Sequence, residues 1–154
     1  MTQGPPRYHG LDHVVLCVTD AARSVDFYTR VLGMSLERII DDFGIWQLRC
    51  GRHIIDLKQV PALAPASERG VDHLCVLVEG PVTPYIEYLE REGVTVTWGP
   101  IELYGATGFG TSVYVLDPDG HTIELKADRA ELPLRTTGRD AAATLTRGPV
   151  APRR

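Results

Sequence analysis

The hydrophobic and polar positions of the chain follow one order of elements twice. Residues 12–18 and 72–78 both begin with Asp-His and continue as apolar runs, which predicts two strands buried on both faces. Apolar positions at helical spacing follow each run and predict helices over 20–33 and 83–93, each ended by a glycine. The second half of the chain therefore repeats the pattern of the first.

Three further strands are predicted after each helix, separated by turn residues. They are expected at 36–40, 45–50 and 53–58 in the first half and at 94–98, 111–116 and 121–126 in the second. The glycine-rich stretch 104–110 is expected to be a loop, and it lacks the GxxxxGK[ST] pattern of a phosphate-binding loop. Each half thus has the order β-α-β-β-β.

The repeat predicts one domain over residues 10–128, built from a module at 10–60 and a module at 71–128. Residues 61–70 have the Pro, Ala and Gly composition of a linker. We expect a loose N-terminal arm at 1–9, which has no periodicity, and a poorly ordered tail over 129–154, where large apolar residues become scarce.

A histidine opens each module and a carboxylate ends it. His13 and His73 begin the apolar runs, and Asp56 and Glu124 stand at the same place in the similar stretches His-Ile-Ile-Asp-Leu-Lys and His-Thr-Ile-Glu-Leu-Lys. A curved sheet cannot bury its apolar face alone, and packing the modules about a pseudo-twofold axis would gather these four side chains. A single histidine in an apolar strand is usually a core residue, but the duplication of both residue types favours a metal site.

Two imidazoles and two carboxylates suit one divalent metal ion, and the mixed nitrogen and oxygen set does not choose among Zn²⁺, Fe²⁺, Ni²⁺ and Mn²⁺. His13, His73 and Glu124 are the stronger ligand candidates. Asp56 has a side chain one methylene shorter than that of Glu124, so it is expected either as a fourth ligand or as the catalytic base.

Other side chains have two readings each. Ser112 and Tyr114 share one face of a predicted strand and either contact substrate or satisfy core hydrogen bonds. Trp46 and Trp98 either wall a substrate cavity or fill the core. Asp12 and Asp72 are read as strand-start residues that could also support the neighbouring histidines, although adjacent strand residues point to opposite faces. His53 and His121 stand three residues before the carboxylates and are expected at the surface or in turns.

Composition and charge narrow the classes of partner. The formal net charge of −4, without a basic run in the body of the chain, predicts no nucleic-acid partner and favours a small-molecule substrate. No stretch approaches the length of a membrane span, and the first residues lack a secretory signal, so a cytoplasmic location without membrane association is expected. The three cysteines have no metal-ligand spacing and are expected to be reduced.

Two stretches resemble the vicinal oxygen chelate superfamily, which includes glyoxalase I, extradiol dioxygenases, fosfomycin-resistance proteins and bleomycin-binding proteins. Leu11-Asp12-His13 with residues 24–34 is similar to the opening of glyoxalase I, and residues 112–124 are similar to the closing strands of the family. The resemblance implies an α+β fold in which two βαβββ modules pair into a cupped mixed β-sheet barrel with flanking helices. It also implies one bound metal and a homodimer, with pairing of modules within or between chains left open.

The resemblance implies an activity on a small molecule that chelates the metal through adjacent oxygens. The first expectation is a glyoxalase I-like lyase or isomerase in which Glu124 is a ligand, Asp56 the base, and Tyr114 a further catalytic group. Asp56 stands where those enzymes carry Glu.

Two alternatives follow from the same resemblance. An extradiol Fe²⁺ dioxygenase would share Tyr114 and Glu124, but the histidine of that signature is absent from residues 104–107. A fosfomycin- or bleomycin-type resistance or ligand-sequestering protein is the other alternative, and Val15 stands where the thiol-transferase branch has Thr.

Overall fold

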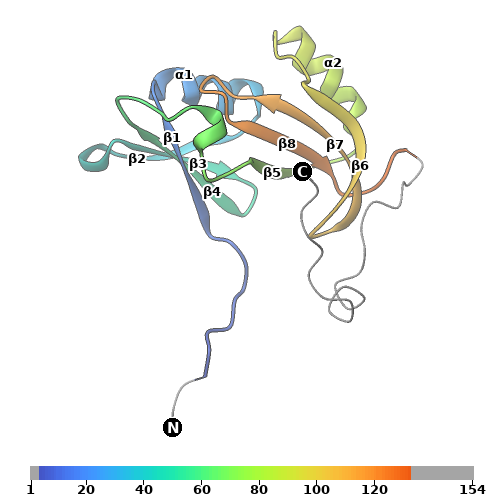
Figure 1. The fold of residues 1–154 in the computed structure, drawn as a ribbon, viewed down its shortest axis with the longest axis horizontal. Helices are drawn as coiled ribbons and strands as arrows, with labels where there is room; N and C mark the ends of the chain where they lie inside the picture. The colour runs from blue at the N-terminus through green and yellow to red at the C-terminus, as the bar shows by residue number, and fades with distance from the viewer. Residues whose placement is uncertain (1–3, 133–154) are drawn as a thin grey trace.

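The chain folds into two modules that repeat one order of elements (Figure 1). The computed structural model describes residues 4–132. Module 1 contains β1 (His13–Val18), α1 (Ala21–Asp26), the π-helical turn η1 (Phe27–Val31), β2 (Ser35–Ile40), the 3-10 turn η2 (Asp41–Phe43), β3 (Ile45–Cys50) and β4 (His53–Gln59). Module 2 contains β5 (His73–Val78), α2 (Thr83–Arg91), β6 (Trp98–Gly105), β7 (Gly108–Leu116) and β8 (Thr122–Ala127), and the short turn η3 (Ala66–Glu68) lies in the connection.

Each module forms its own four-stranded mixed sheet. The strand orders are β1-β4-β3-β2 and β5-β8-β7-β6, with β1 parallel to β4, β5 parallel to β8, and the other pairs antiparallel. The two sheets are equivalent strand for strand, which confirms the α+β class and the duplicated βαβββ order. The predicted tail over 129–154 falls mostly on residues 133–154, which lie outside the described residues.

The first helix begins and ends where the sequence predicts. The Asp20 side chain caps it by accepting a hydrogen bond from the Arg23 backbone N–H at 3.0 Å. The π-helical turn η1 continues it, and Gly33 ends it with a φ of 71°, a left-handed conformation that glycine adopts without strain. None of the described helices is long and apolar enough to cross a membrane.

The predicted strand over 94–98 and the predicted loop over 104–110 are wrong. Strand β6 begins at Trp98, and the glycine-rich stretch forms the end of the β6–β7 hairpin, where Tyr104 pairs with Phe109. The ladder position 110 must be glycine, because a Cβ on Gly110 would approach the Ala127 carbonyl oxygen to 2.0 Å. Gly110 therefore makes room for a neighbouring strand, a requirement that a sequence pattern cannot distinguish from turn formation.

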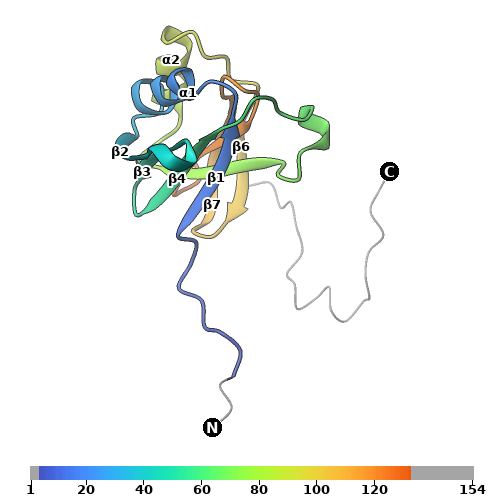
Figure 2. The same ribbon diagram turned by 90° about the vertical axis from the view of Figure 1, so that its left-hand side faces the viewer.

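The core lies between the helices and one face of each sheet, and α1 and α2 lie on the same side of the molecule (Figure 2). Its apolar side chains come from both modules and include Leu16, Val18, Phe27, Tyr28, Leu48, Leu57, Leu89, Val113, Val115 and Ile123. Burial on this side accounts for the apolar strands, since the opposite face of each sheet carries the polar residues of the candidate site.

A turn of module 2 docks on the first strand and helix of module 1. In the turn before β8, the Asp117 carboxylate accepts a hydrogen bond from the Tyr28 hydroxyl at 2.9 Å, and Asp119 accepts from the Thr19 backbone N–H at 3.1 Å. Burial disfavours the charge of Asp119, but hydrogen bonds from Thr19 and the charge of Arg23 outweigh it and lower the pKa of this carboxyl. We call this contact the seam; it fixes the two sheets side by side.

The seam also includes His121, which lies in the predicted turn but is half-buried. Its Nε2 lies 2.8 Å from the Cys17 carbonyl oxygen of β1, and its Nδ1 lies 3.4 Å from the Arg69 guanidinium. Nε2 therefore donates the proton to Cys17 and Nδ1 accepts from Arg69, which is the neutral form of the ring. His53, its counterpart in module 1, is exposed as predicted.

The seam predicts a specific loss of stability. Tyr28→Phe should lower the free energy of unfolding by about 1.5–3 kcal/mol, because it leaves a buried carboxylate oxygen of Asp117 without its donor. Urea denaturation followed by circular dichroism measures the change. Tyr85→Phe is the matched control, since the exposed Tyr85 hydroxyl donates only to the Glu79 carbonyl and should change stability little. Equal effects of the two substitutions would contradict this role of the seam.

Candidate metal centre

The polar face of module 2 brings together side chains from three adjacent strands. The register pairs Cys75 with Glu124 and Glu124 with Tyr114, and partners in a ladder point to the same face. His73 and Ser112 lie two residues from Cys75 and Tyr114, so they share this face as well. The structure therefore collects four of the predicted residues and one cysteine that the sequence analysis did not single out.

His73 and Glu124 form the centre of this group. The His73 Nε2 atom lies 3.1 Å from one carboxylate oxygen of Glu124, and the Ser112 hydroxyl donates to the other oxygen at 2.6 Å. Glu124 is only 5% exposed, so its charge is held by these two contacts rather than by water. Ser112 thus fixes the carboxylate, which is the second of its two predicted roles, and a contact with substrate stays a prediction.

An aspartate orients each of the two histidines. Asp12 Oδ1 lies 2.7 Å from His13 Nδ1, and Asp72 Oδ1 lies 2.7 Å from His73 Nδ1. A carboxylate at Nδ1 holds a proton there and leaves Nε2 for another contact, the arrangement found at histidines that bind metals. Nε2 of His73 makes that contact with Glu124, which a bound metal would have to replace. The hydrogen bond from Asp12, helped by the charge of Asp56, also raises the pKa of His13 against the effect of partial desolvation.

Asp12 and Asp72 take the less expected of their two predicted roles, since adjacent residues within a strand alternate between faces. Strands β1 and β5 begin at His13 and His73 themselves, so Asp12 and Asp72 precede the ladder and the alternation does not apply to them. The repetition of Asp-His at both strand starts was the available signal.

Module 1 repeats the site less completely. Asp56 is 5% exposed and accepts a hydrogen bond from the Gln47 side chain at 3.0 Å. Among the described residues, no contact like that of His73 with Glu124 joins His13 to Asp56, although the charge of Asp56 acts on the His13 ring. The shorter carboxylate stops short of its histidine. Gln47, which the sequence analysis missed, orients it.

The structure separates the two predicted aromatic contacts. Trp46 pairs with the buried Leu57 and packs against the core, so it does not reach the polar face. Tyr114 is 7% exposed and packs edge-on against His73 at 5.6 Å between ring centroids. Trp98 pairs with Tyr114 in the ladder, with 5.0 Å between their ring centroids, and it is exposed on the polar face. Only the register of β6 shows which of the two tryptophans lies on the polar face.

Two weak acids in module 2 keep their protons at neutral pH. Burial raises the pKa of the Tyr114 hydroxyl, and the charge of Glu124 raises it further. Partial removal from water, together with Glu124, raises the pKa of the Cys75 thiol to about 12. Tyr114 can therefore donate a hydrogen bond to a substrate oxygen, and Cys75 remains a neutral thiol beside the carboxylate.

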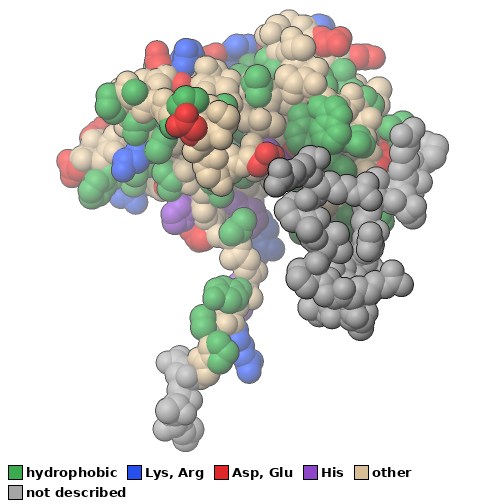
Figure 3. All heavy atoms as spheres, in the orientation of Figure 1, with side chains coloured by type: hydrophobic (Ala, Val, Ile, Leu, Met, Phe, Trp, Pro, Cys, Tyr) green, Lys and Arg blue, Asp and Glu red, His purple; other side chains and the backbone are tan. Residues whose placement is uncertain are grey.

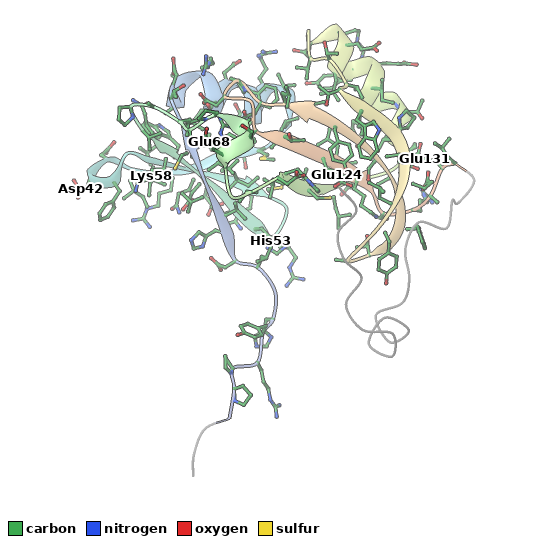
Figure 4. The ribbon with its side chains drawn as sticks, viewed as in Figure 1. Asp42, His53, Lys58, Glu68, Glu124 and Glu131 are labelled. Carbon is green, nitrogen blue, oxygen red and sulfur yellow. The ribbon has the colours of Figure 1, made fainter. Side chains whose placement is uncertain are left out.

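The four predicted ligands form two pairs, one in each module. Within residues 4–132, no three His, Cys, Asp or Glu side chains are arranged to hold a metal ion together. Figure 4 labels Glu124 on β8 and Lys58 on β4, and they lie in different halves of the molecule. Histidine side chains are visible at the surface close to the point where the N-terminal arm leaves the body (Figure 3). The nitrogen and oxygen donors suit a metal ion, but each module provides only one histidine and one carboxylate of the four predicted ligands.

The comparisons with known proteins agree with this fold. Residues 10–125 match the model of the Glyoxalase/Bleomycin resistance protein/Dioxygenase superfamily. The chain therefore belongs to this superfamily, which confirms the resemblance inferred from its opening and closing motifs. The match spans both modules and all four predicted ligand positions.

Two curated proteins and one solved structure illustrate what the chain is similar to. The chain is 30% identical to the virulence protein STM3117 of Salmonella typhimurium over 120 residues, which are 75% of this chain and 81% of that protein. It is 35% identical to the glutathione transferase FosA of Serratia marcescens over 118 residues, covering 75% and 78% of the two chains. An integron cassette protein of V. cholerae has a similar structure, with a TM-score of 0.68, 32% identity and coverage of 80% of this chain and 98% of that one.

The aspartate contact predicts the tautomer of His13. In the metal-free protein, His13 should carry the ring proton on Nδ1 at a pH above its pKa, which ¹⁵N NMR of the imidazole nitrogens reports directly. Asp12→Ala should move the His13 population toward the Nε2–H form, because it removes the acceptor at Nδ1. A predominant Nε2–H form of His13 in the unsubstituted protein would contradict the proposed orientation.

Proposed function

We propose that the protein is a metal-dependent enzyme, a lyase or isomerase whose small-molecule substrate chelates the metal through two adjacent oxygens. The observation that carries the proposal is the repeated half-site, in which an aspartate orients a histidine near a buried carboxylate. Packing alone does not require an exposed histidine held in the same way at the start of both modules. Superfamily membership supports the same class of chemistry.

His13, His73 and Glu124 are the proposed ligands. The Nε2 atoms of both histidines are free of the aspartate contacts, and the Glu124 oxygen that faces His73 can turn to a shared metal. Two neutral imidazoles and one carboxylate leave part of the positive charge of a divalent ion uncompensated, and a chelating oxyanion of the substrate would neutralise the remaining charge. Ni²⁺, Zn²⁺, Fe²⁺ and Mn²⁺ all suit this donor set.

The two half-sites would be joined between two chains. The seam holds the modules side by side, and His13 and His73 are exposed on the polar faces of the single chain. A second copy related by a twofold axis can place its module 2 over module 1 of the first, and the symmetry generates the same contact a second time. The protein would therefore be a homodimer with two equivalent metal sites, each built from both chains.

The side chains around the ligands provide the remaining functions. When bound, the metal would act as a Lewis acid on the substrate oxygens. Asp56 would move the proton, because Gln47 holds it in a buried position where it does not contact His13. Tyr114 would donate a hydrogen bond to a substrate oxygen, and Ser112 would keep Glu124 in place. Trp98 would cover the substrate beside Tyr114.

A glutathione transferase is the second candidate, and the similarity to FosA favours it. Such an enzyme would use the same metal site to activate an electrophilic substrate for attack by a thiol. The exposed Val15 side chain, two residues after His13, would then face the substrate where a thiol transferase has a hydroxyl. Val15 makes this second proposal weaker than the first.

Metal content and activity test the proposal together. Protein purified without added metal is expected to bind one divalent ion per chain, and His13→Ala and His73→Ala should each lower the affinity by about 10-fold or more because each removes a ligand. His53→Ala is the matched control, since His53 occupies a repeat position outside the site and contacts the Leu11 carbonyl. Metal content that does not change in either ligand variant would refute the site.

Activity assays then separate the reaction classes. The Ni²⁺, Zn²⁺, Fe²⁺ and Mn²⁺ forms are assayed with the hemithioacetal of methylglyoxal, with glutathione and fosfomycin, and with catechols while oxygen is monitored. The proposal expects turnover of a chelating substrate without oxygen uptake. Asp56→Asn should keep the bound metal and reduce kcat by about 100-fold or more, the size of a lost proton-transfer group. Loss of metal in this variant would instead make Asp56 a ligand.

A further inference from the structure

The chain contains only two lysines, and they occupy the same position of the repeat. Lys58 and Lys126 each follow a site carboxylate by two residues, in Asp56-Leu57-Lys58 and Glu124-Leu125-Lys126. Lys58 is exposed, whereas Lys126 is 3% exposed. Since lysine is rarely buried without a partner, Lys126 is the unusual member of the pair.

The end of the β6–β7 hairpin forms the surroundings of Lys126. Its Nζ donates to the Gly108 carbonyl oxygen at 3.1 Å and to the Ala127 carbonyl oxygen at 3.3 Å. A Cβ on Gly110 would approach this Nζ to 2.6 Å, and a Cβ on Gly105 would approach Cε to 3.2 Å. The glycines of the hairpin therefore provide the space in which the lysine side chain lies.

The positive charge of Lys126 has no negative partner in its own chain. Among the described residues, no carboxylate forms an ion pair with it, and its two acceptors are neutral carbonyl groups. An ammonium group has three N–H donors, so one remains after these bonds. A methionine would fill the same space without the cost of burying a charge, so packing does not explain a lysine here.

Lys126 lies on the face that carries the candidate metal ligands. It is register partner to Leu77 and Ser112, whose neighbours in the ladder are Cys75 and Tyr114. Two residues along β8 separate it from Glu124, a rise of about 6.7 Å. Its charge also acts on the Cys75 thiol, lowering the pKa of that group against the larger effects of burial and Glu124.

We infer that Lys126 binds a negatively charged group of the substrate, such as a carboxylate, while the adjacent oxygens of the same molecule are held at the metal beside Glu124. The inference rests on the proposed function and narrows its substrate class to chelating molecules with a second, anionic end. Because Lys126 and Glu124 stand two residues apart on one strand, the anionic group and the chelating oxygens would lie along the same face.

Two keto acids that differ only at this end test the inference. In the metal-loaded protein, isothermal titration calorimetry measures the Kd of 2-oxoglutarate and of 2-oxopentanoate, which chelate alike but differ in the second carboxylate. The unsubstituted protein should bind 2-oxoglutarate about 10- to 100-fold more tightly, the effect of one charge-assisted hydrogen bond. Lys126→Met should bring the two Kd values together by weakening 2-oxoglutarate alone.

The controls separate a loss of charge from a loss of fold. Arg91→Met removes one positive charge at the end of α2, away from this face, and should keep the preference. Lys126→Gln keeps an N–H donor without the positive charge, and it replaces Lys126→Met in the Kd comparison if the methionine variant does not fold. If Lys126 only closes the hairpin, the substitutions change thermal stability and leave the ratio of Kd values unchanged.

Each outcome is decisive for one of the two claims. Equal Kd values in the unsubstituted protein, no binding of 2-oxoglutarate to the metal-loaded protein, or an unchanged ratio in both Lys126 variants overturns the inference and leaves the metal site standing. Failure of the protein to bind any divalent metal ion overturns the proposed function, and the inference falls with it.

Discussion

The docking of one turn on the opposite module is the constraint on which the rest of the structure depends. Asp117 accepts a hydrogen bond from the Tyr28 hydroxyl, Asp119 accepts one from the Thr19 N–H, and His121 contacts the Cys17 carbonyl oxygen. Module 2 is therefore held on β1, on the residue after it and on η1. These are buried or half-buried polar contacts with specific geometry, and they fix an orientation that apolar packing would leave free to vary. The orientation places the two sheets side by side, with the histidine of each half-site exposed. A single chain then presents two half-sites in place of one complete site.

The two half-sites hold their histidines in the same way, but only one of the two carboxylates contacts its histidine. An aspartate holds Nδ1 of His13 and of His73 in the same way, so that neither Nε2 atom contacts an aspartate. Glu124 approaches its histidine, whereas Asp56 bonds to Gln47 and makes no such contact. One methylene thus separates a proposed ligand from a proposed base, and the duplication supplied two copies that could diverge in this way. The Lys126 ammonium adds a charge to the same face of module 2, where an anionic end of the substrate would be bound.

The sequence predicted the parts of this structure that depend on periodicity and repetition. The duplicated order of strands and helices, the Asp20 cap and the strand-start histidines follow from local patterns that every copy of the repeat must satisfy. The course of residues 94–110 does not follow from a local pattern, because glycine suits a turn and a close contact between strands equally well. Gly110 is needed because a Cβ there would clash with the Ala127 carbonyl oxygen. Trp46 and Trp98 were indistinguishable without the register. The separation of the half-sites depends on the seam, whose contacts join residues about 100 positions apart and leave no local pattern.

The central claim is that each metal site contains His13 of one chain and His73 of another, and a hybrid dimer tests it most directly. His13→Ala and His73→Ala proteins are mixed, unfolded and refolded together, and high-affinity metal binding is measured. In a hybrid, one site lacks both histidines and the other has both, so the mixture should recover about one quarter of the sites of the unsubstituted protein, while each variant refolded alone recovers none. Recovery no greater than that of the separate variants would show that the modules pair within one chain, and the account of a shared site would be wrong.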